Sequence, residues 1–241
     1  MKIQISHKFK SSNFDNRLNN AKIKYIIIHY TETKSLEEAI KLLTSNTRKV
    51  SCHYIIDCNG LIYNLVDESK RAWHAGISCW KKKTDLNNNS LGIELVNLGE
   101  KSKRKFTNKQ ILSLLDLLFE LKKKYTIKAA NFLGHSDIAP SRKIDPGIYF
   151  PWKLLSKKSF GLWFEVPHKK ENSKKLNKKD EEEFLKNLQK IGYSTQKIKD
   201  IDTNQKKDII NAFHRHFFSE NLNNNPSVKS LVISEGLLKL K

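Results

Sequence analysis

Four consecutive apolar residues, Tyr25-Ile26-Ile27-Ile28, constrain the fold of this chain more than any other feature. A continuous β-branched and aromatic run is typical of a strand that is buried on both faces of its sheet. We therefore predict a central strand within residues 22–30. A sheet with such a strand needs other layers on both sides, and helices are the usual cover.

Two helices are predicted from apolar residues at helical spacing, over residues 35–45 and 107–125. Each opens with a capping box, in which a Ser or Thr side chain satisfies an N–H of the first helical turn. The two pairs are Ser35 with Glu38, and Thr107 with Gln110. In the second helix a continuous apolar stripe predicts that one face packs on the sheet.

Further strands are predicted on either side of Asn59-Gly60, a strong hairpin signal. The two β-rich runs that it joins are residues 51–57 and 61–66, and other short strands are expected at 91–96 and 129–133. Strands mixed with helices indicate an α/β fold with a mixed central β-sheet flanked by helices. We assign this domain to residues 1–160.

A second, smaller domain is expected after a linker. Residues 161–179 are rich in lysine and polar residues and contain Pro167, so we predict a linker there. Apolar residues then recur at helical spacing in three segments, with Gly192 ending the first. We predict an all-α domain over residues 180–241, close to the lower size limit for a core that is stable alone.

The formal net charge of +20 indicates attraction to an anionic partner: nucleic acid, an acidic membrane face or a cell-wall polymer. Lysine runs such as 81–83 and 122–124 have no interleaved aromatic residues. A biased genomic composition that favours lysine codons therefore explains them more simply than a nucleic-acid surface does. Charge alone does not separate these alternatives.

The N-terminal residues and the cysteines bear on cellular location. Residues 1–8 do not develop the apolar run of about 7–15 residues that a secretory signal needs, and no stretch is long enough to span a membrane. The three cysteines, Cys52, Cys58 and Cys79, have no spacing typical of a disulfide framework or a zinc site. We expect a cytoplasmic protein, with export to the periplasm or cell envelope by an unusual route as the alternative.

Two histidines and an aspartate are candidate metal ligands. His29 directly follows the buried run, His135 follows the expected strand at 129–133, and Asp145 lies ten residues further on. Two nitrogen ligands and one oxygen ligand are the set of an open catalytic zinc site, with a fourth position left for water. Taken singly, such histidines are more often packing residues, and Asp-Pro-Gly is more often a turn.

Six short motifs strengthen that interpretation because they occur together and in order. The chain resembles the type 2 N-acetylmuramoyl-L-alanine amidases, the AmpD and AmiD group, which are related to phage amidases and peptidoglycan recognition proteins. The resemblance covers about residues 22–152. Its motifs are YIIIHYT at 25–31, SCHYIID at 51–57, AWHAG at 72–76, NSLGIEL at 89–95, GHSDIAP at 134–140 and KIDPG at 143–147.

The resemblance implies an enzyme with one Zn²⁺ per chain, held by His29, His135 and Asp145. It also implies that Glu94 is the catalytic carboxylate and that Lys143 assists it. A carboxylate can take a proton from water and pass it to the leaving amine, while a lysine can stabilise the oxyanion on the attacked carbonyl. For Lys143 a solvated turn lysine is the alternative.

Five residues are expected to contact substrate. Trp73, His74 and Ala75 lie in a motif that resembles the family's groove wall, Asn89 precedes the strand bearing Glu94, and Tyr54 aligns with a tyrosine that some phage relatives place near zinc. Core packing is the alternative for Trp73 and Tyr54, and solvent exposure for His74. Strand alternation sends His53 to the face opposite Tyr54, so His53 is left out of the site.

The C-terminal domain resembles the small peptidoglycan-binding domain of AmiD-type amidases, notably over residues 211–217. His214 and His216 are about 200° apart on a helix and cannot share a metal ion. We expect both to be surface residues.

The function that the resemblance implies is zinc-dependent hydrolysis of the amide between the lactyl group of N-acetylmuramic acid, or its 1,6-anhydro form, and L-alanine. The expected partner is peptidoglycan or a soluble anhydro-muropeptide, with no nucleic acid and no membrane span. A noncatalytic peptidoglycan-binding or sensing protein on the same fold is the alternative. The complete set of ligand and catalytic positions argues against it, and the oligomeric state stays open.

Overall fold

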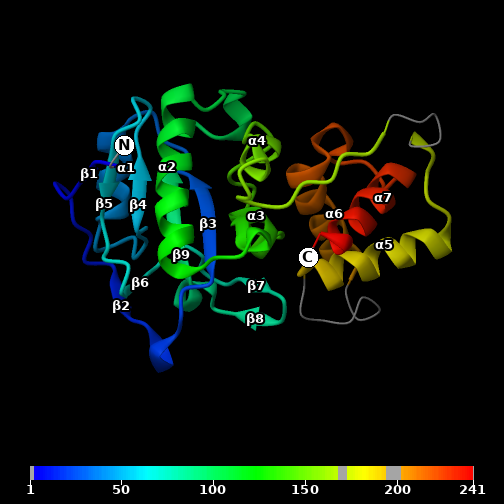
Figure 1. Cartoon of the computed structure of the whole chain (residues 1–241), viewed down its shortest axis with the longest axis horizontal. Coiled ribbons are helices and arrows are strands. Elements are labelled where there is room, and N and C mark those ends of the chain that lie inside the picture. The colour runs from blue at the N-terminus through cyan, green and yellow to red at the C-terminus, as the bar shows by residue number, and fades with distance from the viewer. Residues whose placement is uncertain (1–2, 168–172, 194–201, 241) are drawn as a thin grey trace.

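The computed structural model describes residues 3–167, 173–193 and 202–240 (Figure 1). Its centre is a six-stranded sheet in the order β1-β5-β4-β9-β3-β10, in which all neighbours are parallel except the β4–β5 hairpin. This confirms the mixed α/β fold. The strands are β1 (Ile5–Ser6), β3 (Tyr25–Tyr30), β4 (Tyr54–Ile56), β5 (Ile62–Asn64), β9 (Ser90–Leu95) and β10 (Phe132–Gly134).

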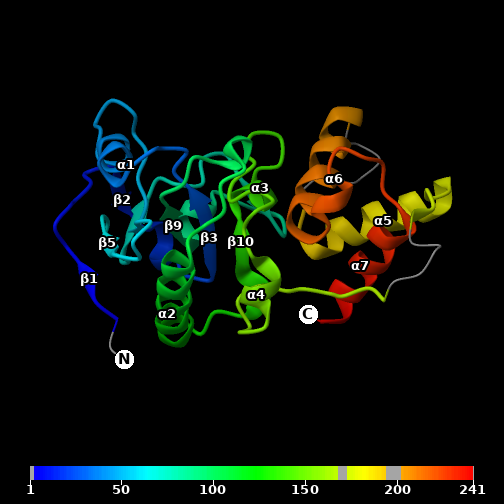
Figure 2. The same cartoon turned by 90° about the horizontal axis from the view of Figure 1, so that it is seen from above.

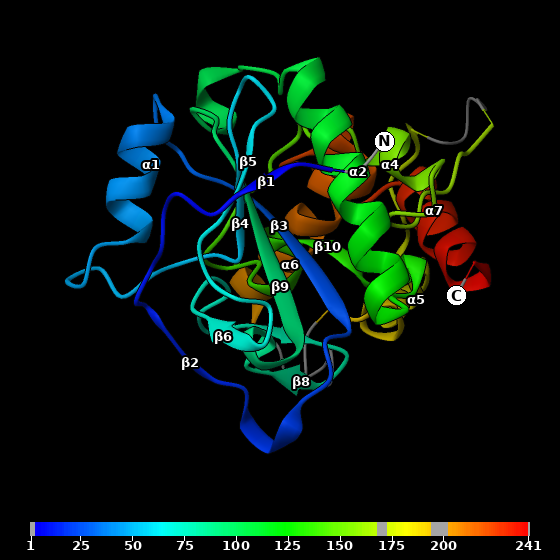
Figure 3. The same cartoon turned by 60° about the vertical axis from the view of Figure 1, so that its left-hand side comes forward.

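Helix α2 (Asn108–Tyr125) lies across one face of the sheet, as Figure 3 shows. Its Leu114 and Leu118 belong to a core cluster with Ile26, Ile28 and Ile93, the strand residues that point to this face. The capping box that begins the helix is present as predicted, and the helix ends at Tyr125. The predicted apolar stripe is therefore the buried side of α2.

The opposite face of the sheet is shared between two groups of helices. Helix α1 (Leu36–Leu43), which begins after the predicted cap Ser35, covers the β4 side. Helices α5 (Lys178–Ile191), α6 (Thr203–Phe217) and α7 (Val228–Lys239) lie on the β10 side (Figure 2). Tyr25, Ile27 and Leu133 of the sheet belong to one core cluster with these three helices. Between the two groups the sheet face is left for polar side chains.

Several small elements complete the fold. The described part of the chain contains no helix that is long and apolar enough to cross a membrane. Residues 129–131, predicted as strand, form a turn of 3-10 helix, and the strand begins only at Phe132. The remaining elements are β2 (Phe14–Asn16) paired with β6 (Lys70–Ala72), β7 (Cys79–Trp80) paired with β8 (Lys83–Thr84), α3 (His135–Ile138), α4 (Trp152–Ser156) and short 3-10 helices at Leu18–Asn20, Leu86–Asn89, Glu100–Ser102 and Ser219–Asn221.

The C-terminal helices are joined to the sheet domain by close packing. Helix α5 ends before Gly192, the residue predicted to stop it, and the φ of this glycine is +149°. Because Gly192 has no side chain, the ring of Trp80 can pack against it. The described part of the predicted linker, 161–167 and 173–179, includes Phe164, which packs against Gly236. A helical domain of this size therefore gains apolar burial from the sheet domain.

The prediction that His214 and His216 are surface residues is wrong, because the two residues are only 0% and 5% exposed. Nε2 of His214 lies 2.9 Å from Oγ of Ser230. His216 stacks on Trp152 at 4.0 Å between ring centroids. Helix α6 is covered on one side by its neighbouring helices and on another by the sheet domain. The apolar pattern of α6 indicates only one buried face, so it did not reveal that both histidines are buried.

Candidate metal centre and active site

Strand register brings the candidate catalytic side chains into one row. His29 of β3 is paired with Glu94 of β9, and Gly134 of β10 is paired with Ile28, so His135 follows at the level of His29. Residues that are paired across parallel strands point to the same face of a sheet. The row lies near the carboxyl ends of three neighbouring strands, on the face opposite α2.

His29, His135 and Asp145 form a buried cluster that could hold a metal ion. Nδ1 of His29 lies 3.0 Å from Nδ1 of His135 and 3.0 Å from Oδ2 of Asp145, and Nδ1 of His135 lies 3.1 Å from the same oxygen. Ligand atoms of a tetrahedral zinc site with bonds of about 2.0–2.1 Å would lie about 3.3 Å apart. The observed spacing is close to that arrangement.

For His29 and His135, the hydrogen bond made by Nε2, on the side away from the cluster, shows which ring nitrogen carries the proton. Nε2 of His135 lies 3.0 Å from the carbonyl oxygen of Ala75 and must donate to it. Ser90 donates its hydroxyl proton to the Leu86 carbonyl, so its Oγ accepts from Nε2 of His74, 3.1 Å away. Nδ1 of His74 then carries a lone pair and accepts from Nε2 of His29 at 3.1 Å.

The inward-facing atoms are consequently all acceptors: two imidazole nitrogens and a carboxylate oxygen. Burial is the main cause that lowers the pKa of His29 to about 4, so its imidazole is neutral near pH 7. Three lone pairs about 3 Å apart repel one another unless a cation lies between them. The donor set therefore fits a metal ion, and its two nitrogens and one oxygen are typical of catalytic zinc.

His74 and Ala75, which contact His29 and His135, are held by hydrogen bonds to Asn87 and by close packing of His74 on Gly92. Oδ1 of Asn87 accepts from the backbone N–H of His74 at 3.0 Å and from that of Ala75 at 2.7 Å. A Cβ atom on Gly92 would lie 2.4 Å from Cγ of His74. Only glycine leaves room on β9 for this imidazole.

A cavity of about 360 Å³ opens beside the cluster and is lined by Glu94, Lys143 and Trp73 among others. Oε2 of Glu94 is buried and has no hydrogen-bond partner in the described chain. Burial, followed by the charge of Asp145, raises the pKa of Glu94 to about 8, while Lys143 opposes the shift. A carboxylate with a free oxygen and a pKa near neutrality is suited to accept and return a proton.

The structure places the residues predicted to contact substrate in three situations. Trp73 and His74 line the cavity, but His74 is only 8% exposed and its ring contacts His29. Ala75 is buried and offers its carbonyl oxygen to His135. Tyr54 and Asn89 do not line this cavity, so the structure does not support substrate contacts by them there.

Register explains why Tyr54 and Asn89 lie elsewhere. Tyr54 is paired with Ile93, which faces α2, so the tyrosine points away from Glu94 and donates its hydroxyl hydrogen bond to Glu68. Asn89 precedes β9 at the opposite end of the sheet, where its Nδ2 donates to the carbonyl oxygen of Lys22. Sequence alignment to a motif does not specify which face a residue takes.

Sequence reasoning missed several residues that support the centre. His53 shares the face of His29: its ring centroid lies 5.6 Å from that of His74, and its Nδ1 accepts from the N–H of Gly92. Asp137 accepts from the Gly134 N–H, from Tyr193 and from His216, beside the ligand His135. Strand alternation correctly placed His53 and Tyr54 on opposite faces, but only strand register shows which of the two faces the candidate metal ligands.

Two histidines and a glutamate at the carboxyl ends of neighbouring strands, joined by an aspartate from the turn after α3, define a candidate metallohydrolase. Comparison with known proteins narrows this class. Residues 19–148 match the family described as N-acetylmuramoyl-L-alanine amidase. The chain belongs to this family.

Named relatives agree with the family assignment. The chain is 34% identical to N-acetylmuramoyl-L-alanine amidase AmiD of Escherichia coli, over 90% of this chain and 83% of that protein. It is also 34% identical to 1,6-anhydro-N-acetylmuramyl-L-alanine amidase AmpD of Haemophilus influenzae, over 61% of this chain and 88% of that protein. Both relatives are amidases by name.

Solved structures match both parts of the chain. Escherichia coli AmiD, in complex with the substrate anhydro-N-acetylmuramic acid-L-Ala-D-γ-Glu-L-Lys, superposes with a TM-score of 0.81 at 30% identity, covering 94% of this chain and 92% of that one. AmpDH3 from Pseudomonas aeruginosa superposes with a TM-score of 0.77 at 26% identity, covering 100% of this chain and 98% of that one. The likeness therefore includes the C-terminal helices.

Proposed function

We propose that this protein is a zinc-dependent amidase that cleaves the bond between the lactyl group of N-acetylmuramic acid and L-alanine. The observation that carries the proposal is the buried cluster of His29, His135 and Asp145, whose inward atoms are all acceptors, beside the unpartnered carboxylate of Glu94. Zinc bound there would act as a Lewis acid on the scissile carbonyl and make water more acidic. The family assignment supports the same reaction.

Glu94 and Lys143 have separate tasks in this proposal. Glu94 takes a proton from the attacking water, whose oxygen forms a bond to the carbonyl carbon. When the carbon–nitrogen bond breaks, Glu94 passes that proton to the leaving amine of L-alanine. The positive charge of Lys143, which lines the same cavity, stabilises the oxyanion that forms before the bond breaks.

The substrate class follows from the relatives. The AmiD structure is a complex with an anhydromuramoyl tripeptide, and AmpDH3 has been solved with an anhydromuramic pentapeptide. We propose that this chain takes the same muramoyl-peptide unit, free or within peptidoglycan. Trp73, on the wall of the cavity, would contact the substrate beside the ligand cluster.

The proposal is tested by adding anhydromuramoyl-L-Ala-D-γ-Glu-L-Lys to the zinc-loaded full chain and identifying products by mass spectrometry. We expect the free tripeptide, formed at a rate that Glu94→Gln lowers by about 10²–10⁴-fold. Glu120→Gln, on the exposed side of α2, is the matched control and should retain the rate of the parent. Binding of the fragment without release of tripeptide would replace the amidase by a noncatalytic binding protein.

A further inference from the structure

A second and larger cavity lies at the amino end of the sheet, and we call it the amino-end groove. Its volume is about 1390 Å³, and none of its lining residues lines the candidate active site. Tyr25, at the start of β3, lines the groove, while His29 on the same strand lines the other cavity. The two residues are four positions apart on the strand, which corresponds to about 13 Å.

Seven Lys and Arg side chains line the groove, but three of them are already bound within the protein. The guanidinium of Arg17 donates to the carbonyl oxygens of Asn87, Asn88 and Ser90. Lys124 forms an ion pair with Glu68, and Lys70 donates to Asn16. These cations therefore serve the fold.

Four other lysines in the groove, on three separate segments of the chain, have no such role. None of their ammonium groups has a hydrogen-bond or ion-pair partner within residues 3–167, 173–193 and 202–240; they are Lys22, Lys24, Lys81 and Lys128. Burial and the nearby charge of Lys128 lower the pKa of Lys81. Cations that gather without a counter-charge from the protein favour an anionic ligand.

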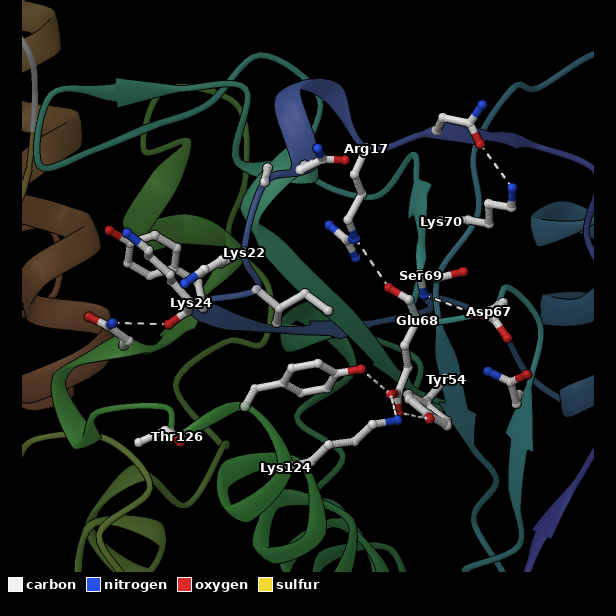
Figure 4. A pocket seen from close by; sticks show the side chains of 18 of the residues that line it. Arg17, Lys22, Lys24, Tyr54, Asp67, Glu68, Ser69, Lys70, Lys124 and Thr126 are labelled. Atoms are coloured by element: carbon white, nitrogen blue, oxygen red, sulfur yellow. Dashed lines mark hydrogen bonds and ion pairs between the residues drawn. The ribbon is translucent and has the colours of Figure 1, made fainter.

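The rest of the lining is mixed, with apolar residues such as Ile5 and Ile23 and with an acidic side. Figure 4 shows Lys22 and Lys24 on one side of the pocket and Glu68 on the other, where Tyr54 and Lys124 contact it. Asp67 is exposed on the acidic side. The lining also contains the amides and hydroxyl groups of Asn16, Asn20, Asn64, Ser69, Thr126 and Asn131. This mixture suits a ligand with carboxylates, amines and amides.

The same lining is poorly suited to nucleic acid or a membrane. Asp67 would face a continuous phosphate backbone with a like charge. Tyr25 and Tyr54 are each 5% exposed, and the partly exposed Tyr125 is held by a hydrogen bond to Glu68, so the groove offers little aromatic surface for bases. A concave surface also touches a flat bilayer less well than it encloses a chain.

We propose that the amino-end groove binds a second peptide stem of polymeric peptidoglycan, with the four lysines contacting its carboxylates and Asp67 its amine. The inference rests on the proposed function for the identity of the polymer. Peptidoglycan repeats its peptide along the glycan, so one strand or two neighbouring strands can occupy both cavities of one molecule. Two linked contacts raise the affinity for polymer above that for a single fragment.

The test measures binding of the full chain to purified insoluble sacculi by sedimentation, in a Glu94→Gln background that leaves the polymer intact. Lys22→Glu with Lys24→Glu reverses two charges in the groove. The control, Lys105→Glu with Lys109→Glu, makes the same change in net charge near the other end of α2, outside both cavities. Thermal unfolding verifies that each variant is folded. A 30-base-pair DNA duplex, followed by fluorescence anisotropy, serves as the competing polyanion.

We expect the groove variant to bind sacculi about tenfold more weakly, and the control to change less than about twofold. Equal losses in both variants, or unchanged binding in the groove variant, would overturn the proposal. A loss confined to DNA binding would assign the groove to nucleic acid and would also overturn it. Binding to sacculi requires no turnover. Failure of the hydrolysis assay alone therefore contradicts the proposed function but leaves the proposal for the amino-end groove to the sedimentation test.

Discussion

Nε2 of His29 lies 3.1 Å from Nδ1 of His74, and this contact sets the orientation of a candidate metal ligand. The proton on Nε2 of His29 fixes the lone pair on its other nitrogen toward His135 and Asp145. Ser90 supports the arrangement by accepting from Nε2 of His74. His74, which was expected to contact substrate, therefore holds the imidazole of a candidate metal ligand in the structure.

His74→Ala should weaken zinc binding by about 10–100-fold, the range found when groups that orient metal ligands are removed. The reason is that the imidazole of His29 loses the acceptor that holds its tautomer and ring plane. Zinc affinity is measured by competition with a chromophoric chelator at pH 7.5. His7→Ala, at an exposed histidine, controls for general loss of imidazole. An affinity within twofold of the parent would remove His74 from this role.

Gly92→Ala should displace the ring of His74, because Gly92 lies directly against it. The new Cβ would overlap the ring of His74, and overpacking of this kind costs about 1–3 kcal/mol of the free energy of unfolding. Urea denaturation measures that cost in the parent and in a His74→Ala background. The cost should shrink in the latter because the clash is gone, and equal costs in the two backgrounds would contradict the contact.

Tyr193→Phe should lower the free energy of unfolding by about 1–3 kcal/mol, because the buried Asp137 loses a donor at 2.6 Å. Asp137 lies two residues after His135, so the C-terminal helices brace the segment that carries this ligand. Tyr149→Phe is the matched control, at a partly exposed tyrosine. Equal denaturation midpoints for the two variants would show that this bond contributes nothing to stability.

Because His214 is buried, we expect the free energy of unfolding to fall in acid. Burial lowers its pKa to about 4, so the unfolded chain, with a pKa near 6.5, binds the proton more readily. The free energy of unfolding should therefore fall by about 1.4 kcal/mol for each pH unit between 6.5 and 4 on account of this group. His214→Gln should remove that share of the slope in urea titrations across this range. An unchanged slope would mean that His214 titrates alike in both states.

The sequence predicted local structure best where one short segment determines it. The capping box at Thr107 and the Asn59-Gly60 hairpin depend on residues a few positions apart, and both are present. Of the box predicted at Ser35, only the bond from the Glu38 N–H to Ser35 forms, because the Glu38 carboxylate accepts from the N–H of Lys34. The buried strand followed from composition alone. Phe132 shows the limit, since the start of β10 depends on pairing with β3.

Features that depend on register or on packing between distant segments were not predictable in this way. Tyr54 and His53 alternate as expected, yet only pairing with β9 decides which of them faces the candidate metal ligands. His216 looked solvent-exposed because its partners, Trp152 and Asp137, lie more than sixty residues away in the chain. The convergence of His29, His135 and Asp145 followed from resemblance, and the structure adds the proton arrangement that suits a cation.

The most direct test of the metal-dependent account is a zinc titration of the metal-free full chain, with hydrolysis of the anhydromuramoyl tripeptide measured at each step. Activity should rise with added zinc and stop rising at one equivalent per chain, because the chain offers one cluster of this kind in its described part. Asp145→Ala should neither bind that equivalent tightly nor gain activity. Full hydrolysis by the metal-free chain, or a plateau unrelated to one equivalent, would contradict the account.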